Sequence, residues 1–184
     1  MVSWLTKMEL TIKKLPSMLQ LRDLPTPEIL GKFADRYPEA DVTATASFLY
    51  LLRVATDLSI ALDTCLSKHD LLQGRWWVLI LLMREESVTS TPSTLAEKIG
   101  VSRATMTGLL DGLEQSGLVT RVFAKEDRRS VKIQLTVAGQ AKLDLVMPDY
   151  YRRLRQCMHG LDEEKRAQLL QLLGLINNGI SAFI

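Results

Sequence analysis

The sequence predicts a mainly α-helical protein with one small β-hairpin. Apolar residues recur at helical spacing along most of the 184 residues. Between residues 91 and 116, two short helical patterns are joined by the tight turn Gly100-Val101-Ser102, and two alternating segments, 118–123 and 131–136, follow around a charged loop. Helix, turn, helix and hairpin in this order form a winged helix-turn-helix. Long apolar patterns on either side predict flanking dimerisation helices.

The composition indicates a globular protein: 47% of the residues are hydrophobic, 24% are charged, and the formal net charge is +2. No uninterrupted apolar run is long enough to span a bilayer, and residues 1–23 lack the compact apolar stretch of a signal peptide. We therefore expect a cytoplasmic protein without membrane contact. Cys65 and Cys157 form no C-x-x-C pair, so we expect no disulfide in that reducing compartment.

Breaks in the apolar pattern divide the chain into four parts. Residues 1–41 form an N-terminal extension that we expect to be helical and associated with the dimer. Residues 42–70 form the first long helix, which links the dimer and DNA-binding lobes. Residues 71–136 form the winged helix-turn-helix DNA-binding domain, and residues 137–184 the C-terminal dimerisation helices.

Local signals set the ends of the outer helices. A helix over residues 1–24 is interrupted by Pro16, and a short helix is expected from Thr26 to about Tyr37. Residues 73–84 are apolar nearly all round, which predicts a helix buried on most sides. In the C-terminal part, Pro148 should bend or interrupt the first helix, and Asp162 should cap the second. That last helix is apolar on more than one face, which favours a partner subunit over packing within the chain.

In the helix-turn-helix, Thr91 is expected to cap the first helix, Gly100 to end it and Ser102 to cap the second. The small and hydrogen-bonding residues of the two helices are the candidate DNA contacts. They are Ser93, Thr94, Ser102, Arg103, Ala104, Thr105, Thr107, Gly108 and Asp111. Glycine costs about 1 kcal/mol inside a helix relative to alanine, so Gly108 and Gly112 suggest a close approach of the backbone to DNA. The alternative is an ordinary solvated face.

The charged loop between the two strands is the candidate wing tip. Arginine at a hairpin tip suits the narrow minor groove, where the negative potential is enhanced. The expected contacts are Lys125, Asp127, Arg128 and Arg129, with Asp127 holding the Arg129 guanidinium. An ordinary charged hairpin tip is the alternative. Because residues 91–136 carry seven Lys/Arg and five Asp/Glu, a net of only +2, affinity should depend on few phosphate contacts and on dimerisation.

Several short motifs coincide here. They are Leu95-Ala96 with Gly100-Val101-Ser102, Leu113-Glu114 with Gly117-Leu118-Val119, and Asp127-Arg128-Arg129 followed by Leu135-Thr136 and Gly139. The chain thereby resembles the MarR family of bacterial transcriptional regulators, with a similar layout from about residue 42 to 184. The resemblance implies a homodimer on a pseudo-palindromic operator, usually a repressor relieved by a small ligand or by oxidation. It also implies that Arg129 enters the minor groove while the helix from Ser102 reads the major groove.

A ligand site would fall between the dimer helices and the DNA-binding lobe. His69, Arg75, Trp76 and Trp77 lie there by their order in the chain, and tryptophan with arginine could clamp an anionic aromatic effector. The alternative is a tryptophan in the core and a solvated arginine. A redox-sensing role for Cys65 would need an exposed thiol with a lowered pKa, and a buried, inert cysteine is the favoured interpretation.

Other classes of protein fit the sequence less well. With two histidines and no hydrolase, metalloprotease or phosphate-loop motif, the chain is not expected to be an enzyme or to hold a metal or cofactor. A winged-helix module for protein contacts without DNA binding remains an alternative, because Asp111 and Glu114 are acidic residues on the recognition helix. A redox-responsive regulator of the same fold is another.

Overall fold

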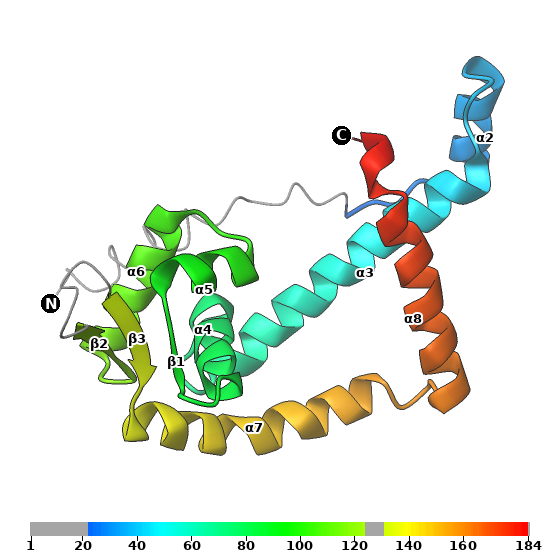
Figure 1. The fold of residues 1–184 in the computed structure, drawn as a ribbon. Helices are drawn as coiled ribbons and strands as arrows, with labels where there is room; N and C mark the ends of the chain where they lie inside the picture. Colours follow the sequence, from blue (N-terminus) through cyan, green and yellow to red (C-terminus); the bar gives the residue numbers. More distant parts are fainter. Residues whose placement is uncertain (1–21, 124–130, 184) are drawn as a thin grey trace, which may run out of the picture. The chain divides into compact units, whose positions relative to one another are not determined.

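The protein is described here by a computed structural model that covers residues 22–123 and 131–183 (Figure 1). Its contacts divide into two compact units, Met1–Thr64 and Cys65–Ile184. Of the helix expected over residues 1–24, residues 1–21 lie outside the described residues, as does the wing tip, and residues 22–24 are not helical.

The first unit contains α2 (Pro27–Arg36) and most of α3 (Val42–Ser67). As predicted, α2 begins at a threonine cap, where the Thr26 hydroxyl accepts a hydrogen bond from the Ile29 amide at 3.3 Å. Asp41 accepts one from the Ala44 amide at 2.9 Å at the start of α3. These caps satisfy amides that the first turn of a helix leaves unpaired.

By length and composition alone, α3 is apolar enough to cross a membrane. The sequence predicts no membrane span, because no apolar run in it is uninterrupted. That reason is not sufficient, because a helix of this length and hydropathy can cross a membrane even with a few charged residues in it. Arg53 and Asp57 form an ion pair of 2.6 Å in the middle of this helix. A charged pair at that depth is unfavourable in hydrocarbon.

The second unit contains α4 (Gln73–Arg84), β1 (Thr89–Ser90), α5 (Pro92–Ile99), α6 (Arg103–Gln115), β2 (Val119–Phe123) and β3 (Val131–Leu135). The predicted helices and hairpin of the winged helix-turn-helix are confirmed, with ends within one or two residues. The helix α4 contacts α5, α6, β1, β3 and the next helix, α7, which explains why it is apolar nearly all round. The buried core of this unit comes from α4 and from the helices and longer strands around it, whereas the two residues of β1 are only half-buried. Its fully buried side chains include Trp76, Val78, Leu79, Leu82, Leu95, Met106, Leu110, Leu113, Ile133 and Leu143.

The sheet has a third strand that the sequence did not predict. All three strands are antiparallel in the order β1-β3-β2, with Ser90 opposite Ile133. Before β1, Val88 has a φ of 47°, and its carbonyl accepts a hydrogen bond from the Leu135 amide at 3.0 Å. A β-branched residue rarely adopts this left-handed conformation, so the pairing with β3 overrides the local preference of the chain.

Two helices complete the unit, α7 (Val137–Cys157) and α8 (Glu163–Asn178), with a short 3-10 helix, η1 (Ile180–Phe183). A bend or an interruption was expected at Pro148, and the structure excludes the interruption, because α7 continues through this residue. Proline removes one backbone hydrogen bond, and Leu143 and Val146 just before it are fully buried, so packing holds the helix across the gap. Asp162 caps α8 as predicted, with its carboxylate accepting from the Lys165 amide at 2.9 Å.

Candidate nucleic-acid interface

The turn between α5 and α6 determines where the recognition helix, α6, begins. Gly100 ends α5 with a φ of 75°, the left-handed conformation that glycine adopts without steric conflict. Two residues later the Ser102 hydroxyl accepts a hydrogen bond from the Thr105 amide at 3.1 Å and starts α6. At the other end of α5, the Thr91 hydroxyl accepts from the Thr94 amide at 3.1 Å. All three predicted capping roles are confirmed.

The helix α6 has one buried face and one exposed face. Met106, Leu110 and Leu113 are buried. The predicted contacts of this helix all lie on the exposed side: Ser102, Arg103, Ala104, Thr105, Thr107, Gly108 and Asp111. Along the N-terminal half, this surface consists of small side chains, hydroxyls and one arginine. It carries hydrogen-bonding groups for base edges and phosphates.

Some of these hydroxyls already have partners within the protein. In α5, Ser93 Oγ and Thr94 Oγ1 lie 3.0 Å and 2.8 Å from Thr91 Oγ1. In α6, the Thr107 hydroxyl donates to the Arg103 carbonyl at 3.0 Å. A hydroxyl that donates inside the protein can still accept a hydrogen bond. Thr107 is therefore suited to accept from an amino group of a base, or to place its methyl group against a thymine.

The hairpin of the wing has the predicted strands. β2 and β3 pair antiparallel, from Val119 opposite Leu135 to Phe123 opposite Val131. Val119, Ile133 and Leu135 are buried, as the alternating pattern requires. The expected tip contacts, Lys125, Asp127, Arg128 and Arg129, lie outside the described residues.

The junction of β3 with α7 explains the Leu-Thr-x-x-Gly motif. The Thr136 hydroxyl accepts a hydrogen bond from the Gly139 amide at 3.0 Å and donates to the Gly117 carbonyl at 2.7 Å. A Cβ added to Gly139 would lie 2.1 Å from the Leu118 carbonyl oxygen. Threonine and glycine are thus needed together, because the first turn of α7 packs directly on the backbone that leads from α6 into β2.

An ion-pair fork joins α6 to β2, and the sequence did not reveal it. The Arg121 side chain donates to Asp111 at 2.6 Å and also pairs with Glu114, while the Arg121 amide donates to Glu114 at 3.1 Å. Both carboxylates raise the pKa of Arg121, and Asp111 contributes most. Asp111, predicted as a DNA contact, is therefore engaged with the hairpin. Acidic residues at i and i+3 on a helix, followed by an arginine in the next strand, are the signal that could have found it.

The space beside Gly112 was predicted to be taken by DNA, but it is taken by another side chain of the protein. A Cβ at this position would lie 2.1 Å from a guanidinium nitrogen of Arg75, which reaches over from α4. The close approach that explains this glycine is therefore to Arg75 and not to DNA. Around Gly108 there is no atom within 4 Å of an added Cβ, so its backbone remains open to a ligand.

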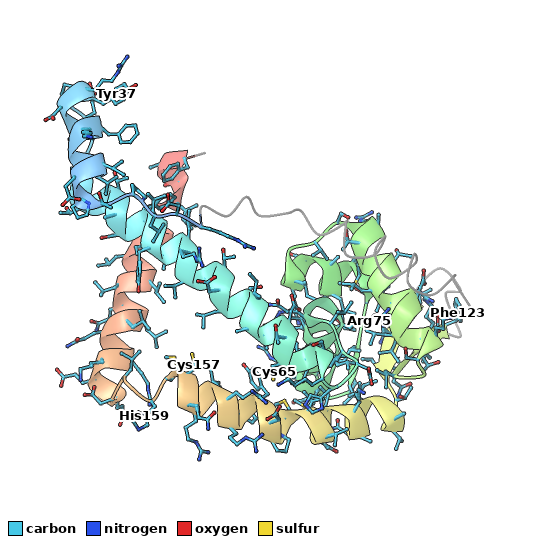
Figure 2. All side chains as sticks on the ribbon, turned by 180° about the vertical axis from the view of Figure 1, so that it is seen from behind. Tyr37, Cys65, Arg75, Phe123, Cys157 and His159 are labelled. Carbon is cyan, nitrogen blue, oxygen red and sulfur yellow. The ribbon has the colours of Figure 1, made fainter. Side chains whose placement is uncertain are left out.

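The four residues expected at a ligand site have different neighbours. Arg75, labelled in Figure 2, has its guanidinium next to the backbone of Gly112 according to the distances given above. Trp76 is a core residue, only 1% exposed, with its ring centroid 5.3 Å from that of Tyr150, whereas Trp77 is 37% exposed. His69 Nε2 lies 3.4 Å from the carboxylate of Asp149. The structure thus bears out the expectation that one tryptophan belongs to the core.

The two cysteines have contrasting surroundings. Cys65 is buried, and its thiol donates to Asp149 at a distance of 3.7 Å. Burial raises the pKa of Cys65, and the Asp149 charge adds to this, whereas Arg153 opposes it. A raised pKa disfavours the reactive thiolate, in line with the inert interpretation. Cys157 is exposed at the end of α7 (Figure 2).

Comparison with known proteins places this lobe in a family. The MarR family model matches residues 72–131. The HTH-type transcriptional regulator PecS of Dickeya dadantii is 31% identical over 163 residues, which are 85% of this chain and 98% of PecS. The chain belongs to the MarR family. It is a MarR-type DNA-binding transcriptional regulator, and the resemblance found in the sequence is confirmed.

A second relative and a solved structure are also similar to this chain. The HTH-type transcriptional repressor YetL of Bacillus subtilis is 28% identical over 165 residues, which cover 90% of this chain and 99% of YetL. A solved structure of the MarR family regulator Sco3205 from Streptomyces coelicolor, in complex with DNA, has a TM-score of 0.67 at 21% identity. The similarity covers 73% of this chain and 86% of Sco3205, and it supports the winged-helix fold.

Proposed function

We propose that the protein binds double-stranded DNA sequence-specifically as a homodimer on a pseudo-palindromic operator and represses transcription in the cytoplasm. The observation that carries this proposal is the exposed N-terminal half of α6. There the buried stripe faces the core, and Arg103, Ala104 and Thr107 lie on the exposed side. A helix presented in this way enters a major groove, where arginine recognises guanine and small residues contact the thymine methyl group.

Dimerisation is supported by α8 and η1. None of their described residues is buried, although Leu170, Leu175 and Phe183 are large and apolar. A helix that exposes so many leucines to water is unstable alone, and an identical helix from a second copy is a natural cover. Two copies place two recognition helices on successive major-groove sites, which is why the operator should be pseudo-palindromic.

Repression is proposed by analogy with YetL, which is named a repressor. Release by a small anionic aromatic ligand is the finer part of the proposal. It is supported by Trp77, an exposed indole two residues after Arg75 in the chain. Salicylate-like compounds titrated against tryptophan fluorescence and operator binding test this part, and no response in either measurement would remove it.

The experiment for DNA binding is selection of genomic fragments by the purified protein, followed by footprinting. The Arg129→Ala variant should fold and dimerise but bind the selected fragment about tenfold or more weakly, with a shallower salt dependence, because the cation expected in the minor groove is lost. Arg155→Ala, an exposed arginine near the end of α7, is the matched control and should bind like the wild type. If Arg129→Ala binds the fragment as tightly as Arg155→Ala and the wild type, the wing assignment is wrong. If the wild type selects no fragment, the proposal of DNA binding is wrong.

A further inference from the structure

The recognition helix carries two carboxylates close to its reading face. Asp111 is 60% exposed and lies one helical turn after Thr107 and Gly108, and Glu114 is the next residue on the same flank. DNA presents a dense row of phosphates, so bare carboxylates here would repel the surface that the helix must approach.

Arg121, on the neighbouring strand β2, forms ion pairs with both carboxylates. Its side chain donates through one nitrogen to Asp111 and through another to Glu114, and its amide fixes Glu114 a second time. Arg121 follows Val119 on the face of β2 that packs against α6, so the strand aims it at the helix. A guanidinium has donors in a rigid fork, so it is well suited to hold two carboxylates from one position.

We propose that Arg121 is a positioning residue that masks the charges of Asp111 and Glu114 and fixes α6 against the wing hairpin, so that the recognition helix can approach DNA. This inference rests on the proposed DNA binding. It assigns a role in the interface to a residue that need not touch DNA. It also accounts for acidic residues on a recognition helix without a loss of DNA binding.

The masking role predicts a specific pattern of affinities. Arg121→Met keeps the length of the side chain but exposes both carboxylates, and binding to the selected fragment and to a mixed-sequence duplex should weaken about tenfold at low salt. The loss should shrink as salt rises, because repulsion between exposed charges is screened. Adding Asp111→Asn restores the wild-type net charge and removes one repelling group, so the double variant should recover most of the affinity.

Two controls separate masking from other effects. Arg155→Met removes the same positive charge from the end of α7 and should change affinity less than about twofold. Urea unfolding of each variant shows whether the fold is retained. Because both carboxylates are at least one-third exposed, Arg121→Met should remain folded at the temperature of the binding experiment.

The outcomes distinguish this inference from the proposed function. If Arg121→Met binds both duplexes as tightly as the wild type, the masking role is wrong. It is also wrong if the double variant binds no better than Arg121→Met, because a purely structural fork is not restored by removing a carboxylate. If the wild type binds neither duplex, DNA binding itself is refuted and this inference with it.

Discussion

The winged helix buries its leucines, whereas the C-terminal helix α8 of the same unit exposes them. Leu79, Leu95 and Leu113 of the winged helix are 0% exposed, whereas Leu170 of α8 is 71% exposed and the helix buries no residue. Both segments are rich in leucine, so composition does not separate them. The difference shows that the winged helix completes its own core, while α8 has an exposed apolar surface, which the proposed dimer would cover.

The largest expected effect is in the core of the winged helix. Leu113→Ala should lower the free energy of unfolding by about 2–5 kcal/mol, because a fully buried leucine leaves both lost apolar contact and a cavity. Urea unfolding followed by circular dichroism measures it. The matched Leu170→Ala, at constant protein concentration, should have a smaller effect, and equal losses would show that α8 is as well packed as α6.

A charge on α8 tests its proposed partner. Leu170→Glu should weaken dimerisation about a hundredfold, because an unpaired carboxylate would be buried in the interface. Sedimentation equilibrium over a range of concentrations measures it. Gln171→Glu adds the same charge where the helix turns its least apolar side and should leave the dimer intact. A dimer unaffected by Leu170→Glu would place the interface elsewhere.

The two glycines of α6 allow an exposed position and a contacted position to be compared within the winged helix. Gly108→Ala should stabilise the protein by up to about 1 kcal/mol, because alanine has the higher helix propensity and the space is open. Gly112→Ala should gain less, because the new methyl group displaces the Arg75 guanidinium. In an Arg75→Ala background the two substitutions should become equivalent in thermal unfolding. A difference that persists there would show that Arg75 is not the cause.

The smallest effect concerns Asp149 on α7. Hydrogen bonds from Arg153 and Arg152, and a weaker one from His69, hold the pKa of this carboxyl far below its usual range. Because the folded pKa is lowered, the stabilisation is complete above the unfolded pKa of about 4 and is lost as the pH falls through the folded pKa. Between about pH 5 and 2, unfolding of the wild type should therefore depend more steeply on pH than that of Asp149→Asn.

A control for this measurement is available on the same helix. Asp144→Asn removes a carboxylate whose described partner is the neutral side chain of Gln140, at 2.9 Å. It should leave the steep acid dependence in place. If Asp149→Asn and the wild type unfold with the same pH dependence, the arginine cluster does not stabilise the fold through this carboxyl.

The features that could be predicted from the sequence were those that depend on residues close together in the chain. Thr91, Gly100, Ser102 and Asp162 marked helix ends because a capping side chain or a left-handed glycine acts within a few residues of its own position. The strands β2 and β3 followed from the alternation of apolar and polar residues. The strand β1 was missed because two residues carry no period. The sequence left open whether Pro148 bends or interrupts its helix, because tertiary packing decides whether α7 continues.

The sequence by itself determined the family, the order of helices and hairpin, and the exposed face of the recognition helix, because periodicity and capping are local properties. Only the tertiary structure decided that Arg121 holds Asp111 and Glu114, and that Arg75 lies over Gly112. Long side chains reach across elements to partners whose distance in the chain is set by packing and not by any local pattern. The predicted DNA surface therefore became a surface whose acidic residues are held by the wing hairpin.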